Sequence, residues 1–567
     1  MSRMLFPAVV AIEAVLVVGA FNPAPHTGGD NALYVSLAHA LLTTGSYVEL
    51  FDPAGLPHTK YPPVFPALLA ALIALGGRTW VALKSTAAVS TVAAVAFTYL
   101  WAARRVGPWA AFAVALLLGA SSAVVYYSHW VLSDPLFLAL TMASLWAMEG
   151  SGGSASPVVR EGAATPDAAG PGRPLFLAVG VAAAGLAYLT RSAGLPLVVA
   201  IGVWLVASKR WRALAASALA IGVPAVWWWV RGLGAAGSYS TEFWMVDPYQ
   251  PALGTIGIAA LVPRAVTNLG GYVLTHGPGG IVGTRGGWVS LLGVALTLAA
   301  LYGWMRSARR RVGPSEIFFP LYGGLILLWP VVWAGDRFAL PLYPFLFFYA
   351  AVALAGLRAR VPLLVGQLAT ALVLLATLAP AAASWVRESG TARACARIVS
   401  SEGPWACYGP RVGAFVAAAE WAATGLPEGA AVMTRKPGIF YLSSGVPSRT
   451  FPFVPEPDAQ LALADSMGAR YVLLDEWDGI AGAYVGGAVT RRPGAFCYVQ
   501  GFGAPGEGGA QLLGILPPDA RAHAEPTRAE EVRIGLCPAG YSVAPASTPQ
   551  PSSSAPTRVP LLDALAP

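Results

Sequence analysis

The chain has 567 residues, of which 56% are hydrophobic and only 11% are charged. A soluble protein cannot bury that much apolar surface, and several runs reach the roughly 20 apolar residues that cross a bilayer as a helix. The net charge of +8 comes without a basic stripe interleaved with aromatic residues on a soluble segment, so nothing indicates nucleic-acid binding. The composition predicts a polytopic helical membrane protein.

Apolar segments predict about eleven membrane-spanning helices. In chain order they cover residues 5–21, 80–102, 109–127, 132–148, 175–189, 194–207, 213–230, 288–305, 317–333, 338–357 and 361–380. Val18-Gly19-Ala20 resembles a signal-peptide cleavage site, but Glu13 interrupts this apolar run and cleavage would release the loop that follows. We therefore expect residues 5–21 to remain as the first span.

Lysine and arginine fall at every second boundary between these spans. Arg104 and Arg105 follow the second span, and Arg309, Arg310 and Arg311 follow the eighth. Because basic residues are retained on the cytoplasmic side, this alternation predicts a cytoplasmic N-terminus and an extracytoplasmic C-terminal region. We call helix ends on the extracytoplasmic side outer ends.

The sequence predicts three regions: a membrane domain (1–384), a soluble domain (385–543) and a Pro/Ser-rich tail (544–567). In the soluble region, helix-like and strand-like segments alternate, which favours a small α/β domain. These segments are residues 413–424, 430–434, 458–467 and 470–475.

Two segments lack any periodic spacing of apolar residues. The tail and the Gly/Ser/Pro-rich stretch at 150–173 are both expected to be flexible. Within the soluble region, Glu420, Lys436 and Asp475 are expected to be solvated charges rather than ligands.

All the cysteines, Cys395, Cys407, Cys497 and Cys537, follow the last span. An oxidising compartment favours disulfides. Three pairings are possible, and the shorter loops favour Cys395 with Cys407 and Cys497 with Cys537. Four unpaired buried thiols are the alternative, and the spacing lacks the CxxC form of a zinc site.

The first outer loop carries two motifs. Gly28-Gly29-Asp30-Asn31 begins a helical pattern with leucines four residues apart, and Lys60-Tyr61-Pro62-Pro63 precedes a second short apolar segment at 64–75. Both segments suit helices that lie on a bilayer surface. The pairing resembles the first outer loop of the C-type glycosyltransferase superfamily, and in particular bacterial protein O-mannosyltransferases and lipid A aminoarabinose transferases.

The resemblance implies roles for several residues. Asp30 would be the catalytic carboxylate that deprotonates an acceptor hydroxyl, and its alternative role is a helix cap. Asp134, in Ser133-Asp134-Pro135-Leu136, would be a second acidic site residue, with a helix start as the alternative. The family pattern has Asp-Glu where this chain has Asp30-Asn31. The residues expected to face the substrate are Asn31, Tyr34, Tyr61 and His129.

A lipid phosphate leaving group needs cations beside the membrane surface. Lys60, Arg191 and Arg337 all fall at outer ends of spans, so we expect them to bind the donor phosphate. Alternatively they extend to the lipid headgroups, and Arg337 pairs with Asp336. His26, His58 and His129 are weak candidates for a divalent metal, because no ligand spacing compels a site. No cofactor is expected to be required.

No Walker lysine motif, HExxH, or GxGxxG and GxSxG on suitable elements is recognisable, so rival functions are membrane functions. The resemblance implies an inverting glycosyltransferase in the cytoplasmic membrane of a bacterium. It would move a hexosyl or pentosyl group from a polyprenyl-phosphate carrier to a lipid, glycan or protein acceptor. The alternatives are a transporter or lipid-carrier flippase, or an inactive structural subunit. Apart from Glu13, few charges lie inside spans, which disfavours a transporter.

Overall fold

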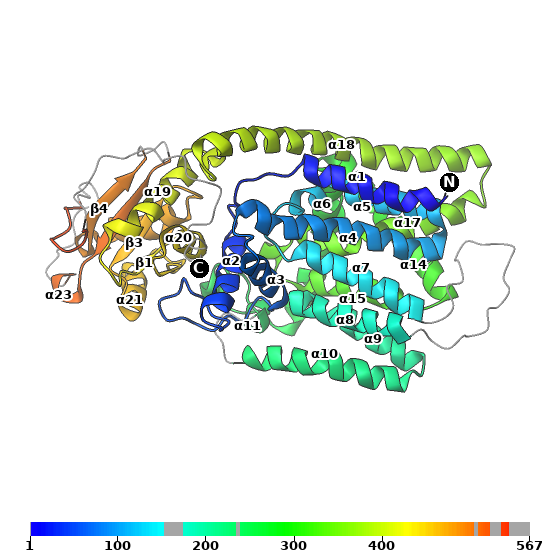
Figure 1. Ribbon diagram of the computed structural model, residues 1–567, viewed down its shortest axis with the longest axis horizontal. Helices are drawn as coiled ribbons and strands as arrows, with labels where there is room; N and C mark the ends of the chain where they lie inside the picture. Colours follow the sequence, from blue (N-terminus) through cyan, green and yellow to red (C-terminus); the bar gives the residue numbers. More distant parts are fainter. Residues whose placement is uncertain (1, 152–173, 234–238, 504–507, 522–533, 544–567) are drawn as a thin grey trace. The chain divides into compact units, whose positions relative to one another are not determined.

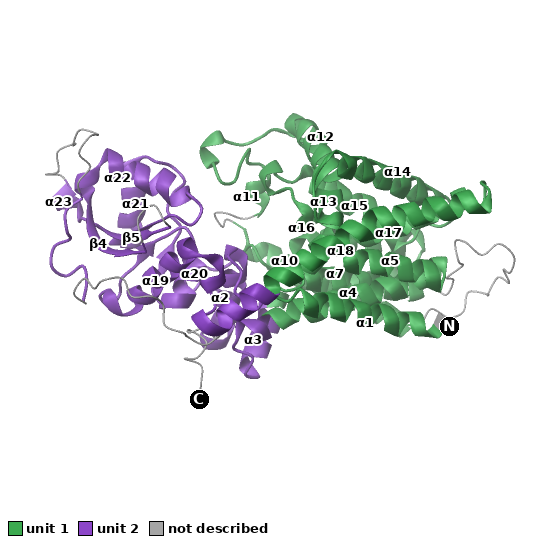
Figure 2. Cartoon of the chain, turned by 90° about the horizontal axis from the view of Figure 1, so that it is seen from above, with its two compact units in different colours: residues 1–21, 59–65, 84–392 green, residues 22–58, 66–83, 393–567 purple. Residues whose placement is uncertain are grey.

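The computed structural model describes residues 2–151, 174–233, 239–503, 508–521 and 534–543. The predicted flexible tail, and nearly all of the predicted flexible segment at 150–173, lie outside the described residues. Contacts divide the chain into two compact units, which Figure 2 colours green and purple. The helical unit comprises residues 1–21, 59–65 and 84–392, and the α/β unit comprises residues 22–58, 66–83 and 393–567.

The helical unit consists of apolar helices, many of which run roughly parallel in Figure 1. By length and composition, those able to cross a membrane are α4 (Trp80–Val106), α10 (Trp211–Arg231), α14 (Gly287–Arg310), α16–α17 (Asp336–Arg358) and α18 (Leu363–Glu402). Shorter helices are α1 (Leu5–Gly19), α5 (Pro108–Ala120), α6 (Ser122–Tyr127), α7 (Asp134–Ser151), α8 (Pro174–Thr190), α9 (Leu195–Ala207), α11 (Tyr239–Phe243), α12 (Leu261–Gly271), α13 (Gly277–Val282) and α15 (Pro314–Leu328).

Each predicted span coincides with helical structure, so the prediction of a mostly helical chain with many apolar helices is confirmed. The span predicted at 109–127 is two helices, because Ser121 has extended backbone angles between α5 and α6. The span predicted at 317–333 forms α15 and a following 3-10 turn at Val331–Trp333. How many of these helices cross a membrane stays a prediction.

A buried ionic network joins several helices at the ends opposite the outer ones. Arg105 of α4 pairs with Glu316 of α15, and lies 3.4 Å from Glu149 of α7. The Ser307 and Tyr349 hydroxyls each donate to Glu316 Oε1 at 3.0 Å. Charges taken out of water are tolerated when they are paired and hydrogen-bonded. The network therefore links α4, α7, α14, α15 and α17.

The α/β unit contains a five-stranded sheet in the order β2-β1-β3-β5-β4. Strands β1 (Val432–Met433), β2 (Ser448–Arg449) and β3 (Tyr471–Asp475) are parallel, whereas β5 (Ala510–Ile515) is antiparallel to β3 and to β4 (Phe496–Phe502). The helices are α19 (Pro410–Gly425), α20 (Pro437–Ser444), α21 (Pro457–Met467), α22 (Gly487–Arg491) and α23 (Pro518–Arg521). The prediction of a small C-terminal sheet with helices is confirmed.

The two predicted disulfides, Cys395–Cys407 and Cys497–Cys537, are both present. The first joins the end of α18 to the turn before α19. The second joins β4 to the segment that follows the sheet. The described part of the chain therefore contains no free cysteine, as the predicted pairing requires.

The first outer loop contributes its own helices to the α/β unit. These are α2 (Gly29–Thr43) and most of α3 (Val64–Ala74), in agreement with the two short helices expected from the sequence. Gly45 follows α2 with a φ of +64°, a left-handed conformation that glycine adopts without strain. Helix α20 packs against α2, and Figure 2 shows the two side by side.

Candidate functional site

Asp30 lies in the first turn of α2. The helix begins at Gly29 with Gly28 as the N-cap residue, so the helix starts two residues earlier than a capping role for Asp30 would require. The backbone N–H of Gly28 donates to Nδ1 of His26 at 2.8 Å, and the buried Asn31 amide lies 3.2 Å from the same nitrogen. A carboxylate in a first helical turn is stabilised by the positive end of the helix dipole. The loop thus presents Asp30 from a fixed helix start.

Lys60 is paired with a residue that the sequence analysis did not single out. Its Nζ lies 2.5 Å from Oε1 of Glu242 in α11. Burial raises the pKa of Glu242, and the Lys60 ammonium opposes that rise. Lys60 therefore carries a charge that is already balanced, and a phosphate would have to share it with Glu242.

Asp134 brings two of the predicted cations together. Its Oδ1 lies 2.7 Å from Arg191, and its Oδ2 accepts from Nε of Arg337 at 2.8 Å. Asp134 begins α7, Arg191 follows α8, and Arg337 lies in α16, so the ends of three helices meet here. The Asp134 side chain is 6% exposed, while Arg191 is 14% and Arg337 22% exposed. The carboxylate holds two guanidinium groups in place, and both remain partly accessible.

Asp336 supports this cluster from the other side. Its Oδ1 accepts from the backbone N–H of Arg337 at 2.9 Å and from the Tyr127 hydroxyl at 3.0 Å. A pair between Arg337 and Asp336 is the alternative that the sequence left open. In the structure the Arg337 Nε–H donates to Oδ2 of Asp134, and the backbone N–H of Arg337 donates to Asp336. Asp336 thereby orients the start of α16.

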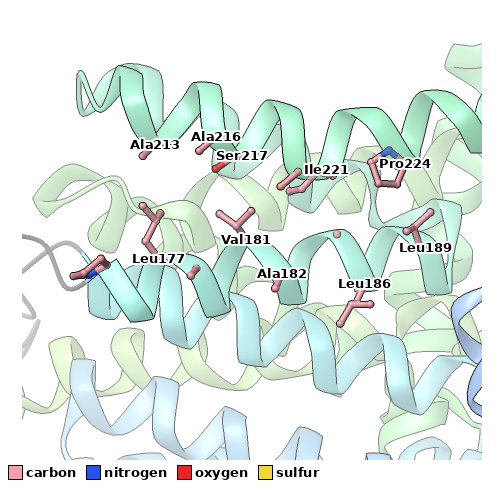
Figure 3. A pocket seen from close by; sticks show the side chains of 14 residues that line it. Leu177, Val181, Ala182, Leu186, Leu189, Ala213, Ala216, Ser217, Ile221 and Pro224 are labelled. Atoms are coloured by element: carbon pink, nitrogen blue, oxygen red, sulfur yellow. The ribbon is translucent and has the colours of Figure 1, made fainter.

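An apolar groove of about 590 Å³ runs between α8 and α10 (Figure 3). Leu177 and Ala213 line one end of it, and Leu189 and Pro224 line the other. Leu189 precedes Arg191 by two residues, so the groove ends beside the predicted phosphate-binding side of the helical unit. An apolar groove on helices of this kind suits a hydrocarbon chain.

The three candidate metal ligands do not form a cluster among the residues that the structure describes. His58 Nδ1 is 2.8 Å from Glu49, and His26 accepts from the Gly28 backbone. His129 is buried against the rings of Tyr126 and Trp130 in the helical unit. These surroundings do not fit a shared divalent cation.

Of the residues that were expected to be solvated, Asp475 is buried and Lys436 is half-buried. Asp475 is 2% exposed, and the Lys436 side chain is 14% exposed. The prediction is wrong for Asp475, because Asp475 is the last residue of β3 and pairs with Ala510 of β5 inside the sheet. Glu420 is exposed, as expected. Of the residues predicted to face the substrate, Tyr34 and Asn31 are buried and Tyr61 is half-buried.

Apolar helices followed by a small α/β domain form an architecture that this chain shares with solved structures of glycosyltransferases. No protein-family model and no curated protein matches the chain. Several solved structures match the chain. The oligosaccharyltransferase of Archaeoglobus fulgidus in complex with Zn and sulfate has a TM-score of 0.55 and 15% identity, over 87% of this chain and 72% of that chain.

Two further solved structures are similar in fold to this chain. Archaeal oligosaccharyltransferase AglB from Archaeoglobus fulgidus, in complex with an inhibitory peptide and a dolichol-phosphate, has a TM-score of 0.52 and 13% identity, over 89% of this chain and 74% of that chain. ArnT from Cupriavidus metallidurans, bound to undecaprenyl phosphate, has a TM-score of 0.51 and 15% identity, over 91% of this chain and 98% of that chain. The resemblance inferred from the first outer loop is confirmed at the level of the fold.

Proposed function

We propose that this protein is an inverting glycosyltransferase that moves a sugar from a polyprenyl-phosphate carrier to an acceptor hydroxyl on the extracytoplasmic side of a bacterial cytoplasmic membrane. The sugar is a hexosyl or pentosyl group, and the acceptor is a lipid, a glycan or a protein. The observation that carries the proposal is the Asp134 carboxylate holding Arg191 and Arg337 together at outer helix ends.

The donor phosphate binds at these guanidinium groups. A guanidinium has five N–H donors in a planar fork, which matches phosphate oxygens, and its contact with Asp134 restricts its orientation before the ligand arrives. Lys60 adds a third cation, although its charge is shared with Glu242. The hydrocarbon chain lies in the groove between α8 and α10, whose outer end is two residues from Arg191.

Asp30 acts as the general base. It takes the proton from the acceptor hydroxyl while the hydroxyl oxygen attacks the anomeric carbon opposite the phosphate. The bond between that carbon and the phosphate oxygen breaks, and its electron pair leaves with the polyprenyl phosphate. Cations stabilise the charge that develops on this oxygen. One displacement inverts the anomeric configuration, and Asn31 in place of the usual second acid leaves Asp30 as the sole carboxylate of the motif.

The binding step is tested with purified protein in nanodiscs and undecaprenyl phosphate as the probe. Arg191→Gln and Arg337→Gln are each expected to weaken binding by roughly 10- to 100-fold, because a charge-assisted contact is lost. Arg387→Gln is the matched control, since Arg387 is an exposed arginine that donates to the Gly283 carbonyl. Equal binding by all variants would remove the phosphate site from the proposal.

The transfer step separates this function from its rivals. Reconstituted wild-type protein is supplied with polyprenyl-phosphate sugars, and the lipid extract is analysed by mass spectrometry for free carrier phosphate and glycosylated product. A flippase or an inactive subunit would bind the carrier and leave the glycosidic bond intact. Release of carrier phosphate that depends on an acceptor supports the transferase.

A further inference from the structure

Lys436 lies at the junction between the C-terminal sheet and the helix that carries Asp30. It follows β1 by three residues and is the N-cap residue of α20. Helix α20 packs on α2 so closely that a Cβ at Gly438 would lie 3.3 Å from the Cβ of Ala32. Ala32 is two residues beyond Asp30 in the first turns of α2. The N-terminal ends of the two helices therefore bring Lys436 and Asp30 into one charged region of the α/β unit.

Asp478, in the segment after β3, is the carboxylate that pairs with Lys436. The Lys436 Nζ is 3.9 Å from Oδ2 of Asp478, and Nε of Arg435 is 3.4 Å from the same oxygen. One carboxylate therefore serves two cations. The Lys436 Nζ also lies 5.2 Å from the centre of the Trp477 ring. Asp478 is shared between the two cations, so Lys436 is not committed to a single carboxylate and can act on others nearby.

The charged groups that act on Lys436 are Arg435, Asp478, Asp475 and Asp30. Burial is the main cause that lowers the pKa of Lys436, and Arg435 lowers it further, whereas the three carboxylates raise it. Coulomb interaction between two groups is mutual. The ammonium that Asp30 stabilises therefore stabilises the Asp30 carboxylate in return. The stabilisation of the Asp30 carboxylate matters most when a substrate displaces water, because desolvation favours the protonated form of a carboxylic acid.

We infer that Lys436 is a positioning residue for the transfer reaction, and that its ammonium keeps Asp30 ionised as substrates cover the site. The C-terminal domain thereby controls the charge of the general base. The inference rests on the proposed function, in which Asp30 is that base. In the proposed function the donor phosphate binds at Arg191 and Arg337, so Lys436 affects the rate of transfer and leaves carrier binding unchanged.

The test is the pH dependence of transfer. In Lys436→Gln the acid limb of the kcat/KM profile is expected to move to higher pH by roughly one unit, as loss of a nearby opposite charge does. Lys436→Arg keeps the charge and should restore the wild-type limb. Arg492→Gln is the matched control, because Arg492 forms an exposed ion pair with Asp458 at 2.6 Å. Carrier binding is measured on every variant.

Asp475 must be accounted for, because burial raises its pKa to about 6, within the range of the assay. The comparison is therefore repeated with Asp475→Asn present in both proteins. If Lys436→Gln fails to fold, Asp478→Asn provides the opposite test. It removes the competing carboxylate, keeps a side chain able to accept from the Ile480 N–H, and should move the acid limb to lower pH.

The outcomes separate the two proposals. Loss of activity at all pH values in Lys436→Gln, without rescue by Lys436→Arg, would assign it a purely structural role and overturn the inference. An unchanged acid limb would do the same. An inactive wild-type protein, or an Asp30→Asn variant with full activity, would instead overturn the proposed function.

Discussion

The Lys60 ammonium lies 2.5 Å from the Glu242 carboxylate, although 182 residues separate them in the chain. The ion pair attaches the Lys-Tyr-Pro-Pro motif of the first outer loop to α11, in the long segment between α10 and α14. Both residues belong to the helical unit. The pair sets the charge available beside the membrane, and it leads to the first prediction.

Glu242→Gln should strengthen binding of undecaprenyl phosphate, and Lys60→Gln should weaken it by roughly 10-fold. The glutamine removes the negative charge and leaves the ammonium to the phosphate. Because the pKa of Glu242 is raised, acidification neutralises it earlier than an exposed glutamate. Wild-type binding should thus tighten as pH falls, relative to Glu242→Gln. Titrations in nanodiscs at several pH values check this, and parallel pH curves for the two proteins would contradict it.

Asp30→Asn should abolish transfer, with a loss of roughly 100-fold or more, because a general base contributes about 10²- to 10⁴-fold. Asparagine retains the size of the side chain and suits a helix start, so folding and membrane insertion should be unaffected. Asp458→Asn, at an exposed ion pair, is the control. Turnover is measured by release of carrier phosphate, and undiminished turnover would end the assignment of Asp30 as base.

Arg105→Met should destabilise the helical unit by about 3–5 kcal/mol, because it leaves Glu316 and Glu149 buried without their cation. Arg309→Met changes an exposed arginine in the last turn of α14 and should have little effect. Thermal unfolding in detergent reports the difference as a lower Tm. Equal Tm values for the two variants would show that the network is not needed for stability.

The stability of the α/β unit should depend on Asp475. Burial raises its pKa to about 6 in the folded chain, so the native state binds this proton more tightly than the unfolded chain. The resulting stabilisation is present at acid pH and is lost as pH rises through 6, by about 3 kcal/mol in total. Asp475→Asn should remove this dependence. Unfolding monitored between about pH 4 and 8 tests it, and identical profiles for both proteins would refute it.

Membrane topology provides a further prediction. Single cysteines placed in residues 150–173 should react only from the cytoplasmic side, and those placed in exposed positions of the α/β unit only from the other side. The native cysteines are paired in disulfides and should not react with the label until they are reduced. Labelling of both regions from one side would overturn the predicted orientation.

Properties that depend on neighbouring residues in the chain followed from the sequence. Hydrophobic length predicted the apolar helices, and the leucine spacing after Asp30 predicted α2. The short loop between Cys395 and Cys407 predicted their pairing, because nearby thiols close small loops at low entropic cost. The first outer loop carried enough local pattern to indicate the fold that the solved structures share.

Only the tertiary structure decided which charges meet. Lys60 is paired with Glu242, and the Arg337 guanidinium contacts Asp134 even though Asp336 is its neighbour in sequence. The sequence predicted a solvated charge at Asp475, which is buried. Its burial depends on how β3 and β5 pair, and a local sequence pattern does not contain that information. Ion pairing acts over a few ångströms in space and is indifferent to separation along the chain. The sequence by itself thus determined the elements and the candidate residues, and the packing of those elements decided the partners of each charge.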